Sequence, residues 1–212
     1  MIGQQLLSIA AVALLCSLGA NFFLFFSLKD RYYNEKIRAV FPIPPIVRND
    51  YNSNDSKINK RVILLGDSRI AQWNNLPKVD GVEFIRRGVS GETSAQLRLR
   101  LTQELSMISP NCIILQIGIN DLVAIGIAPA LEHKIVEQLK SNYTYMLEEC
   151  GKKNIRVFLL TIIPPGSPPL YRRPFWNSRI PDLVEDINQW ILNDISNKYN
   201  ITVLKYRLVS ID

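Results

Sequence analysis

The strongest constraint on the fold is an alternation that begins after residue 60, where short apolar runs are separated by longer segments with helical spacing. Strands that alternate with helices typically form a parallel sheet covered on both faces. The sequence therefore predicts an α/β domain built on a parallel sheet with helices on both faces. We expect the strands near residues 62–65, 82–85, 112–117, 157–163 and 201–204.

Apolar residues recur every three or four positions in the longer segments, which is typical of amphipathic helices. These segments cover residues 93–108, 128–150 and 181–197. The stretch Leu97-Arg98-Leu99-Arg100-Leu101 also alternates as a strand would. The length and position of its segment nevertheless favour a helix.

The composition indicates one well-buried domain with an appendage, because the chain has 212 residues and 47% of them are hydrophobic. The net charge of +6 is modest and the basic residues are scattered, so we expect no nucleic-acid partner. Cys16, Cys112 and Cys150 match no metal-ligand spacing, and their odd number argues against a disulfide framework. We therefore expect neither a metal nor another cofactor.

The appendage is the N-terminal segment. Residues 6–28 form an almost uncharged apolar stretch, long enough to cross a bilayer core of roughly 30 Å. We interpret residues 1–28 as a single-pass membrane anchor and residues 29–60, which contain Phe41-Pro42-Ile43-Pro44-Pro45, as a stalk. A cleaved signal peptide is the alternative, because Leu18-Gly19-Ala20 offers small residues. The apolar run beyond this point and the lack of basic residues before it argue against cleavage.

The first apolar run of the domain leads directly into a Gly-Asp-Ser turn. Residues 61–70 read Arg-Val-Ile-Leu-Leu-Gly-Asp-Ser-Arg-Ile, which places the hydroxyl of Ser68 at the end of a buried strand. Two more turns of small residues follow, Ser90-Gly91-Glu92-Thr93 and Gly118-Ile119-Asn120-Asp121. The ligand site of an open α/β sheet lies beyond the carboxyl ends of its strands, so we expect the three turns to meet there.

The three turns contain a nucleophile and the donors that ester cleavage needs. A serine hydroxyl is a weak nucleophile at neutral pH, so the reaction requires a base and fixed donors for the oxyanion. Gly91 leaves its N–H accessible, and Asn120 can direct a carboxamide N–H toward the same point as the Ser68 and Gly91 amides. Each turn also has a structural interpretation. Gly-Asp-Ser is a common turn, Gly88 and Gly91 could relieve crowding, and Asn120 could cap an element.

In their order and spacing, the three turns resemble those of the SGNH (GDSL-type) hydrolases, close to the acetylhydrolase and lysophospholipase branches. The resemblance extends from about residue 61 to the C-terminus. It implies a three-layer, flavodoxin-like α/β fold with the strand order 2-1-3-4-5. It implies that Ser68 is the nucleophile and that Gly91 and Asn120 are oxyanion-hole residues. It also implies a carboxylic ester substrate, such as an acetylated glycan or a lipid acyl ester. Asp67 and Asp121 are expected to stabilise the turns.

The sequence departs from the family pattern in two places. Arg86 stands where the family often has Asn ahead of its second block. The family takes its base from an Asp-x-x-His segment after the last strand, but this sequence reaches Val209-Ser210-Ile211-Asp212 without one. We interpret this as a truncated C-terminus and do not assign Asp212 to a triad. The single histidine, His133, falls on the polar face of its helix, which predicts a solvent-facing side chain.

Three functions remain open at this point. The leading interpretation is a membrane-anchored esterase whose last segment is absent from the sequence. The second is a degenerate domain that binds an acyl or glycan ligand without turnover, and the third is an enzyme whose base comes from a partner chain. Tyr171, Phe175 and Trp176 in the loop 166–179 could line the pocket or pack.

The side of the membrane on which the domain lies also stays open. Lys29, Arg31, Lys36 and Arg38 follow the apolar stretch and no basic residue precedes it, which favours a cytoplasmic domain. Enzymes that the chain resembles often work in the cell envelope, which favours the opposite side.

Overall fold

The structure is a computed structural model that describes residues 2–40, 58–168, 170, 173, 176–199 and 201–206. It divides into two compact units, Met1–Ile37 and Arg38–Asp212. Several predicted features lie outside the described residues: the proline segment 41–45, the polar residues 49–57, Tyr171, Phe175 and Asp212.

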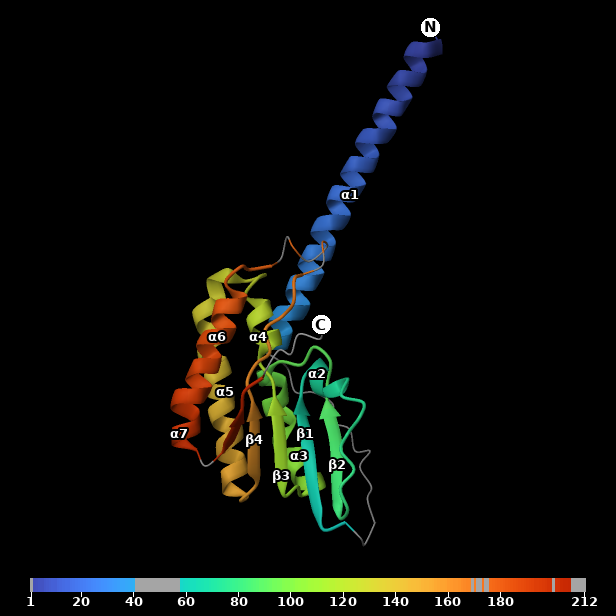
Figure 1. Ribbon diagram of the computed structural model, residues 1–212. Helices are drawn as coiled ribbons and strands as arrows, with labels where there is room; N and C mark the ends of the chain where they lie inside the picture. The colour runs from blue at the N-terminus through green and yellow to red at the C-terminus, as the bar shows by residue number, and fades with distance from the viewer. Residues whose placement is uncertain are drawn as a thin grey trace, which may run out of the picture. The chain divides into compact units, whose positions relative to one another are not determined.

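The first unit is a single helix, α1 (Ile2–Val40), coloured blue in Figure 1. Its stretch Ile9–Glu35 has a mean hydropathy of 2.2, and none of that stretch is buried. Such a helix is long and apolar enough to span a membrane, and a signal sequence has the same properties. The helix continues beyond Leu28, where we placed the end of the anchor, because residues 29–40 contain neither glycine nor proline.

The second unit is built on a five-stranded parallel sheet. Its strand order, β2-β1-β3-β4-β5, confirms the predicted order (Figure 1). In the central part of the sheet, Gly66 pairs with Gly88 on one side and with Gln116 on the other. The carboxyl ends of β2, β1 and β3 therefore lie at the same level. The strands are β1 (Lys60–Gly66), β2 (Val82–Gly88), β3 (Cys112–Gln116), β4 (Arg156–Leu160) and β5 (Thr202–Leu204).

Helices connect the strands, which confirms the flavodoxin-like α/β fold class. The segment that includes 97–101 is helical rather than extended, and its helix packs against α5 behind the sheet in Figure 1. The helical elements are α2 (Ser68–Ala71), α3 (Ser94–Ile108), α4 (Ile119–Ala124), η1 (Pro129–Leu131), α5 (Glu132–Lys152), α6 (Ile180–Trp190), the π-helical η3 (Ile191–Ile195) and α7 (Ser196–Lys198).

Local sequence explains where α3 begins. Thr93 and Gln96 form a capping box, in which Gln96 N donates to Thr93 Oγ1 at 3.4 Å and Thr93 N donates to Gln96 Oε1 at 3.0 Å. The helix then buries Leu97, Leu101 and Leu105 against the sheet core. The capping box fixes the second turn to the start of a buried helix.

Strand β4 ends at Leu160, so the predicted strand 157–163 was too long. Beyond it, the backbone of Ile162 is bound by a side chain instead of a neighbouring strand. Ile162 N donates to Asn188 Oδ1 at 2.7 Å, and Asn188 Nδ2 donates to Ile162 O at 2.8 Å. Because Asn188 satisfies both backbone groups, the chain leaves the sheet without leaving buried polar atoms unpaired.

Candidate active site

The first turn places Ser68 at the start of α2, immediately after β1. Asp67 caps this helix, since its Oδ1 accepts a hydrogen bond from Arg69 N at 2.9 Å. Gly66 precedes it with φ at +153°, and a Cβ atom there would overlap the carbonyl oxygen of Gln116. Only glycine therefore allows β1 to turn this close to the end of β3.

The second turn contains two glycines with different roles. A Cβ atom on Gly88 would overlap the backbone of Ala71, so relief of crowding explains that glycine. Gly91 is exposed, adopts φ +79° and has open space around the position of a Cβ. Crowding therefore does not explain the glycine at position 91. Its left-handed backbone conformation does, because glycine adopts that conformation without strain.

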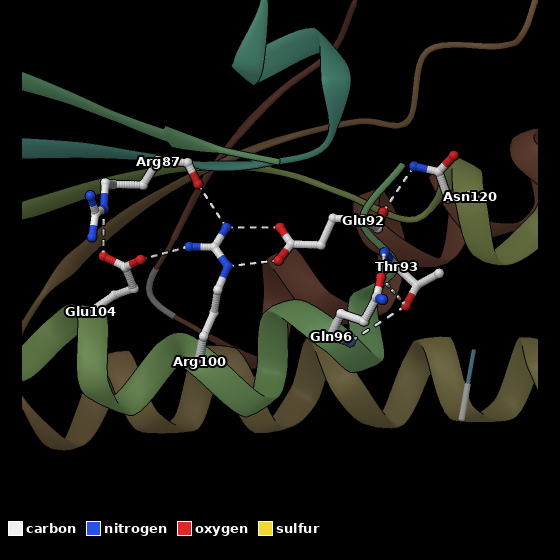
Figure 2. Close-up of polar contacts among 7 residues, drawn as sticks. All are labelled: Arg87, Glu92, Thr93, Gln96, Arg100, Glu104 and Asn120. Carbon is white, nitrogen blue, oxygen red and sulfur yellow. Dashed lines mark hydrogen bonds and ion pairs between the residues drawn. The ribbon is translucent and has the colours of Figure 1, made fainter. Parts of the chain in front are cut away.

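Hydrogen bonds join all three turns. Val89 N donates to Gly66 O at 2.9 Å, and Asp67 N donates to Gln116 O at 3.3 Å. Asn120, the second residue of α4, donates from Nδ2 to the carbonyl oxygen of Glu92 at 2.9 Å, as Figure 2 shows. The structure thus brings the segments that contain Ser68, Gly91 and Asn120 to one edge of the sheet.

Two backbone donors at this edge are unused. Within the described part of the chain, no hydrogen bond has Ser68 N or Gly91 N as its donor. Their neighbours are engaged: Arg69 N donates to Asp67 and Glu92 N donates to Val89 O. Unused N–H groups beside a serine at the end of a sheet are the donors that an oxyanion hole requires.

A buried acid lies next to each candidate residue: Asp67 beside Ser68, Glu92 beside Gly91 and Asp121 beside Asn120. Burial raises the pKa of all three carboxyl groups, and it raises the pKa of Asp121 to about 6. Hydrogen bonds from Ser94 oppose this shift at Asp121. The charge of Asp67 further raises the pKa of the other two acids, so the three turns are close enough to be electrostatically coupled.

Asp121 fastens the third turn to the start of α3. Its Oδ2 accepts from Ser94 N at 2.9 Å and its Oδ1 accepts from Ser94 Oγ at 2.6 Å. Asn142 Nδ2 on α5 donates to the same Ser94 hydroxyl at 2.9 Å. Asp67 and Asp121 therefore hold turns, as the sequence predicted.

The sequence profile of the GDSL-like lipase/acylhydrolase family matches residues 64–203. The chain belongs to this family. The match begins within β1 and includes all three turns. No curated protein sequence matches the chain at a significant level.

Solved structures of GDSL-type and related esterases have the same fold. An acetylxylan esterase from Geobacillus stearothermophilus, Axe2, aligns with a TM-score of 0.54 and 15% identity, covering 70% of this chain and 76% of that one. The esterase EstA from Pseudoalteromonas sp. aligns with a TM-score of 0.50 and 19% identity, covering 70% of this chain and 78% of that one. At such identities the likeness concerns the fold alone.

Three other residues that the sequence singled out have defined positions in this GDSL-like domain. Arg86 donates from Nη1 to Trp73 O at 3.0 Å and to Asn74 Oδ1 at 3.1 Å, so it holds the segment after α2. His133 is exposed near the start of α5, as predicted. Trp176 packs partly buried against the core. The Asp-x-x-His segment stays a prediction.

A buried cluster of charges, which the motifs in the sequence did not predict, lies beneath the second turn. Arg87, Glu92, Arg100 and Glu104, here called the Arg100 cluster, are joined by ion pairs (Figure 2). A signal for it exists in the sequence, because Arg100 and Glu104 fall on the same stripe of α3 as Leu97, Leu101 and Leu105. Charges on a buried helical stripe need partners.

The described residues contain no group of three or more His, Cys, Asp or Glu side chains arranged to hold a metal ion. Cys16, Cys112 and Cys150 are free.

Proposed function

We propose that the chain is a membrane-anchored serine esterase that hydrolyses a carboxylic ester through Ser68. The observation that supports this most is a pair of backbone donors, Ser68 N and Gly91 N, that bond to no described residue and lie at the edge of the sheet with Ser68 and Asn120.

The proposed reaction has two steps. Ser68 Oγ attacks the carbonyl carbon of the ester while its proton passes to a base, which in the family pattern is the histidine of the Asp-x-x-His segment, and the carbonyl oxygen becomes an oxyanion. The N–H groups of Ser68 and Gly91 and the amide of Asn120 donate to this oxygen. The alcohol then leaves with a proton, and water hydrolyses the acyl ester formed on Ser68.

The orientation of Asn120 supports its part in this reaction. Its Nδ2 rather than its Oδ1 faces the Glu92 carbonyl, because two oxygens would repel each other there. A carboxamide nitrogen has two hydrogens, so the bond to Glu92 uses one and leaves the second for a substrate oxygen.

The first test is the hydrolysis of p-nitrophenyl acetate by the full chain in detergent micelles. We expect Ser68→Ala to lower kcat by about 10³-fold or more, and Asn120→Ala to lower it by about 10²- to 10³-fold. Ser106→Ala, which removes an exposed hydroxyl on α3, is the matched control and should keep wild-type rates. Activity that survives in Ser68→Ala would exclude the proposed nucleophile.

The proposed substrate is an acetylated glycan or a lipid acyl ester. The name of Axe2, an acetylxylan esterase with the same fold, supports the glycan, and the apolar helix α1 supports a lipid. Acetylated xylo-oligosaccharides and lysophosphatidylcholine separate the two, each compared with p-nitrophenyl acetate. A higher kcat/KM for acetylated xylo-oligosaccharides would support the glycan, and a higher kcat/KM for lysophosphatidylcholine would support the lipid. Hydrolysis of the preferred substrate should be lost in Ser68→Ala.

The anchor proposal rests on the exposed surface of α1. Phe22, Phe23, Leu24 and other large apolar side chains are exposed along it. The side-chain nitrogen of Asn21 is bonded within the helix, since its Nδ2 donates to Ser17 O at 2.8 Å. We expect the full chain to stay in the membrane pellet after alkaline carbonate extraction, with an intact mass that retains residue 1. Release of a product shortened near Ala20 would support a signal peptide instead.

A second candidate function is a domain that binds an acyl or glycan ligand without turnover. It is favoured by the position of His133, the one histidine of the sequence, because this residue is exposed on α5 and does not lie in one of the three turns with Ser68. A serine-reactive fluorophosphonate separates the candidates. Strong labelling that disappears in Ser68→Ala supports the esterase, whereas absence of labelling on folded protein supports the binding domain.

A further inference from the structure

The Arg100 cluster is the most extensive group of buried charges in the described domain. The guanidinium of Arg100 bonds Glu92 through both carboxylate oxygens, with Nε–Oε1 at 2.6 Å and Nη2–Oε2 at 2.8 Å. Its Nη1 bonds Glu104 Oε1 at 2.9 Å, and its Nη2 also donates to Arg87 O at 2.7 Å. Arg87 Nε completes the cluster by bonding Glu104 Oε2 at 2.8 Å.

Stability alone does not account for this cluster. Glu92, Arg100 and Glu104 are 4%, 6% and 2% exposed, so they lose nearly all of their hydration. The attraction within a buried ion pair often only offsets that loss, and apolar residues of similar volume are frequently as stable. A cluster of this kind does, however, hold its members in one geometry, since a bidentate Arg–carboxylate pair restricts both side chains.

The geometry that the cluster restricts belongs to the second turn. Glu92 directly follows Gly91, whose N–H is one proposed oxyanion donor. The carbonyl of the same Glu92 accepts from Asn120 Nδ2 at 2.9 Å and so sets the orientation of the Asn120 amide, a second proposed donor (Figure 2). Arg100 thus fixes Glu92, on which the positions of Gly91 N and of the Asn120 amide depend.

We infer that Glu92 and Arg100 are positioning residues for the oxyanion hole, acting through the Glu92 backbone on Gly91 and Asn120. The inference rests on the proposed esterase function. Without the Glu92–Arg100 pair, the turn can shift and the amide of Asn120 loses its fixed acceptor. Donors that are misplaced in this way bind the ground state as before but stabilise the transition state less.

The test measures kcat and KM for p-nitrophenyl acetate with the full chain in detergent. Arg100→Met should lower kcat by about ten- to a hundred-fold with KM changed little, because donor alignment affects the transition state. Arg100→Lys keeps the charge but not the fork of donors, so its kcat should lie between Arg100→Met and wild type. Glu92→Gln, which keeps the shape of the side chain, should also lower kcat and provides the test if Arg100→Met does not fold.

Leu105→Ala is the matched control, because it removes a buried side chain of α3 outside the cluster. Compared well below both melting temperatures, this variant should keep the wild-type kcat. A kcat for Leu105→Ala as low as that of Arg100→Met would assign the effect to loss of stability and overturn the inference.

A double-mutant cycle tests the route of the effect. If Arg100 acts through Asn120 and Gly91, adding Arg100→Met to Asn120→Ala should cost much less kcat than it costs in the wild type. Fully additive losses would contradict the inference while leaving the esterase proposal intact. Failure of the esterase proposal itself is recognised separately, by activity that does not depend on Ser68.

Discussion

The buried carboxyl group of Asp121 should make the stability of the domain depend on pH. Asp121 is 2% exposed and its pKa is raised from 3.8 to about 6 in the folded chain, mainly by burial. The folded state therefore binds a proton more tightly than the unfolded state. Between these two pKa values stability falls as pH rises, and above about pH 7 this group contributes little further change.

The two pKa values set the size of the effect. They predict that Asp121 stabilises the folded state by about 1 kcal/mol more at pH 5 than at pH 7. For a domain of this size, that difference corresponds to roughly 2 to 4 °C in the melting temperature. Asp121→Asn cannot ionise, so the variant should lack this part of the pH dependence.

The assay compares the melting temperatures of wild type and Asp121→Asn at pH 5 and pH 7, followed by tryptophan fluorescence. Asp67 and Glu92 also have raised pKa values and remain in both proteins, so their contributions cancel except for the coupling between Asp67 and Asp121. Asp186→Asn, which replaces an exposed carboxylate on α6, is the control and should keep the wild-type pH dependence. Equal pH dependence in wild type and Asp121→Asn would refute the reasoning.

Three further substitutions test separate features. Gly66→Ala should destabilise the domain by about 3 kcal/mol or more, because the added Cβ would overlap Gln116 O. Gly91→Ala should cost about 1 kcal/mol, because alanine is strained in the left-handed backbone of that residue. Equal losses of unfolding free energy in urea would contradict this contrast. Asn188→Ala should cost about 2 to 4 kcal/mol, since it leaves the buried backbone of Ile162 unpaired, while the exposed Gln189→Ala should be neutral in the same assay. His133→Ala should keep kcat/KM within about two-fold, and a loss of about 100-fold would instead make His133 the base.

The features that could be predicted from sequence are those set by local pattern. Alternation of apolar runs and amphipathic segments predicts the strands and the main helices, and the family resemblance predicts the sheet order. The three turns follow predicted strands directly, so the end of each strand places its turn at the same edge of the sheet. The positions of Ser68, Gly91 and Asn120 therefore follow from the sequence, whereas their catalytic roles remain a proposal.

The features that could not be predicted depend on partners distant in the sequence. Strand β4 ends early because the side chain of Asn188, 26 residues after Ile162, bonds the backbone N–H and carbonyl of Ile162. The Arg100 cluster joins residues of β2, the second turn and α3, and only the tertiary structure brings them together. The short helices α2 and α4 are too brief for a periodic pattern to indicate them.

The most direct test of the central claim is a crystal structure of the protein after reaction with a small alkyl fluorophosphonate. The account predicts a phosphonyl group covalently bound to Ser68 Oγ, with one phosphonyl oxygen about 2.7 to 3.1 Å from both Gly91 N and Asn120 Nδ2. A phosphonyl oxygen that points away from both donors, or a label on a residue other than Ser68, would contradict the account.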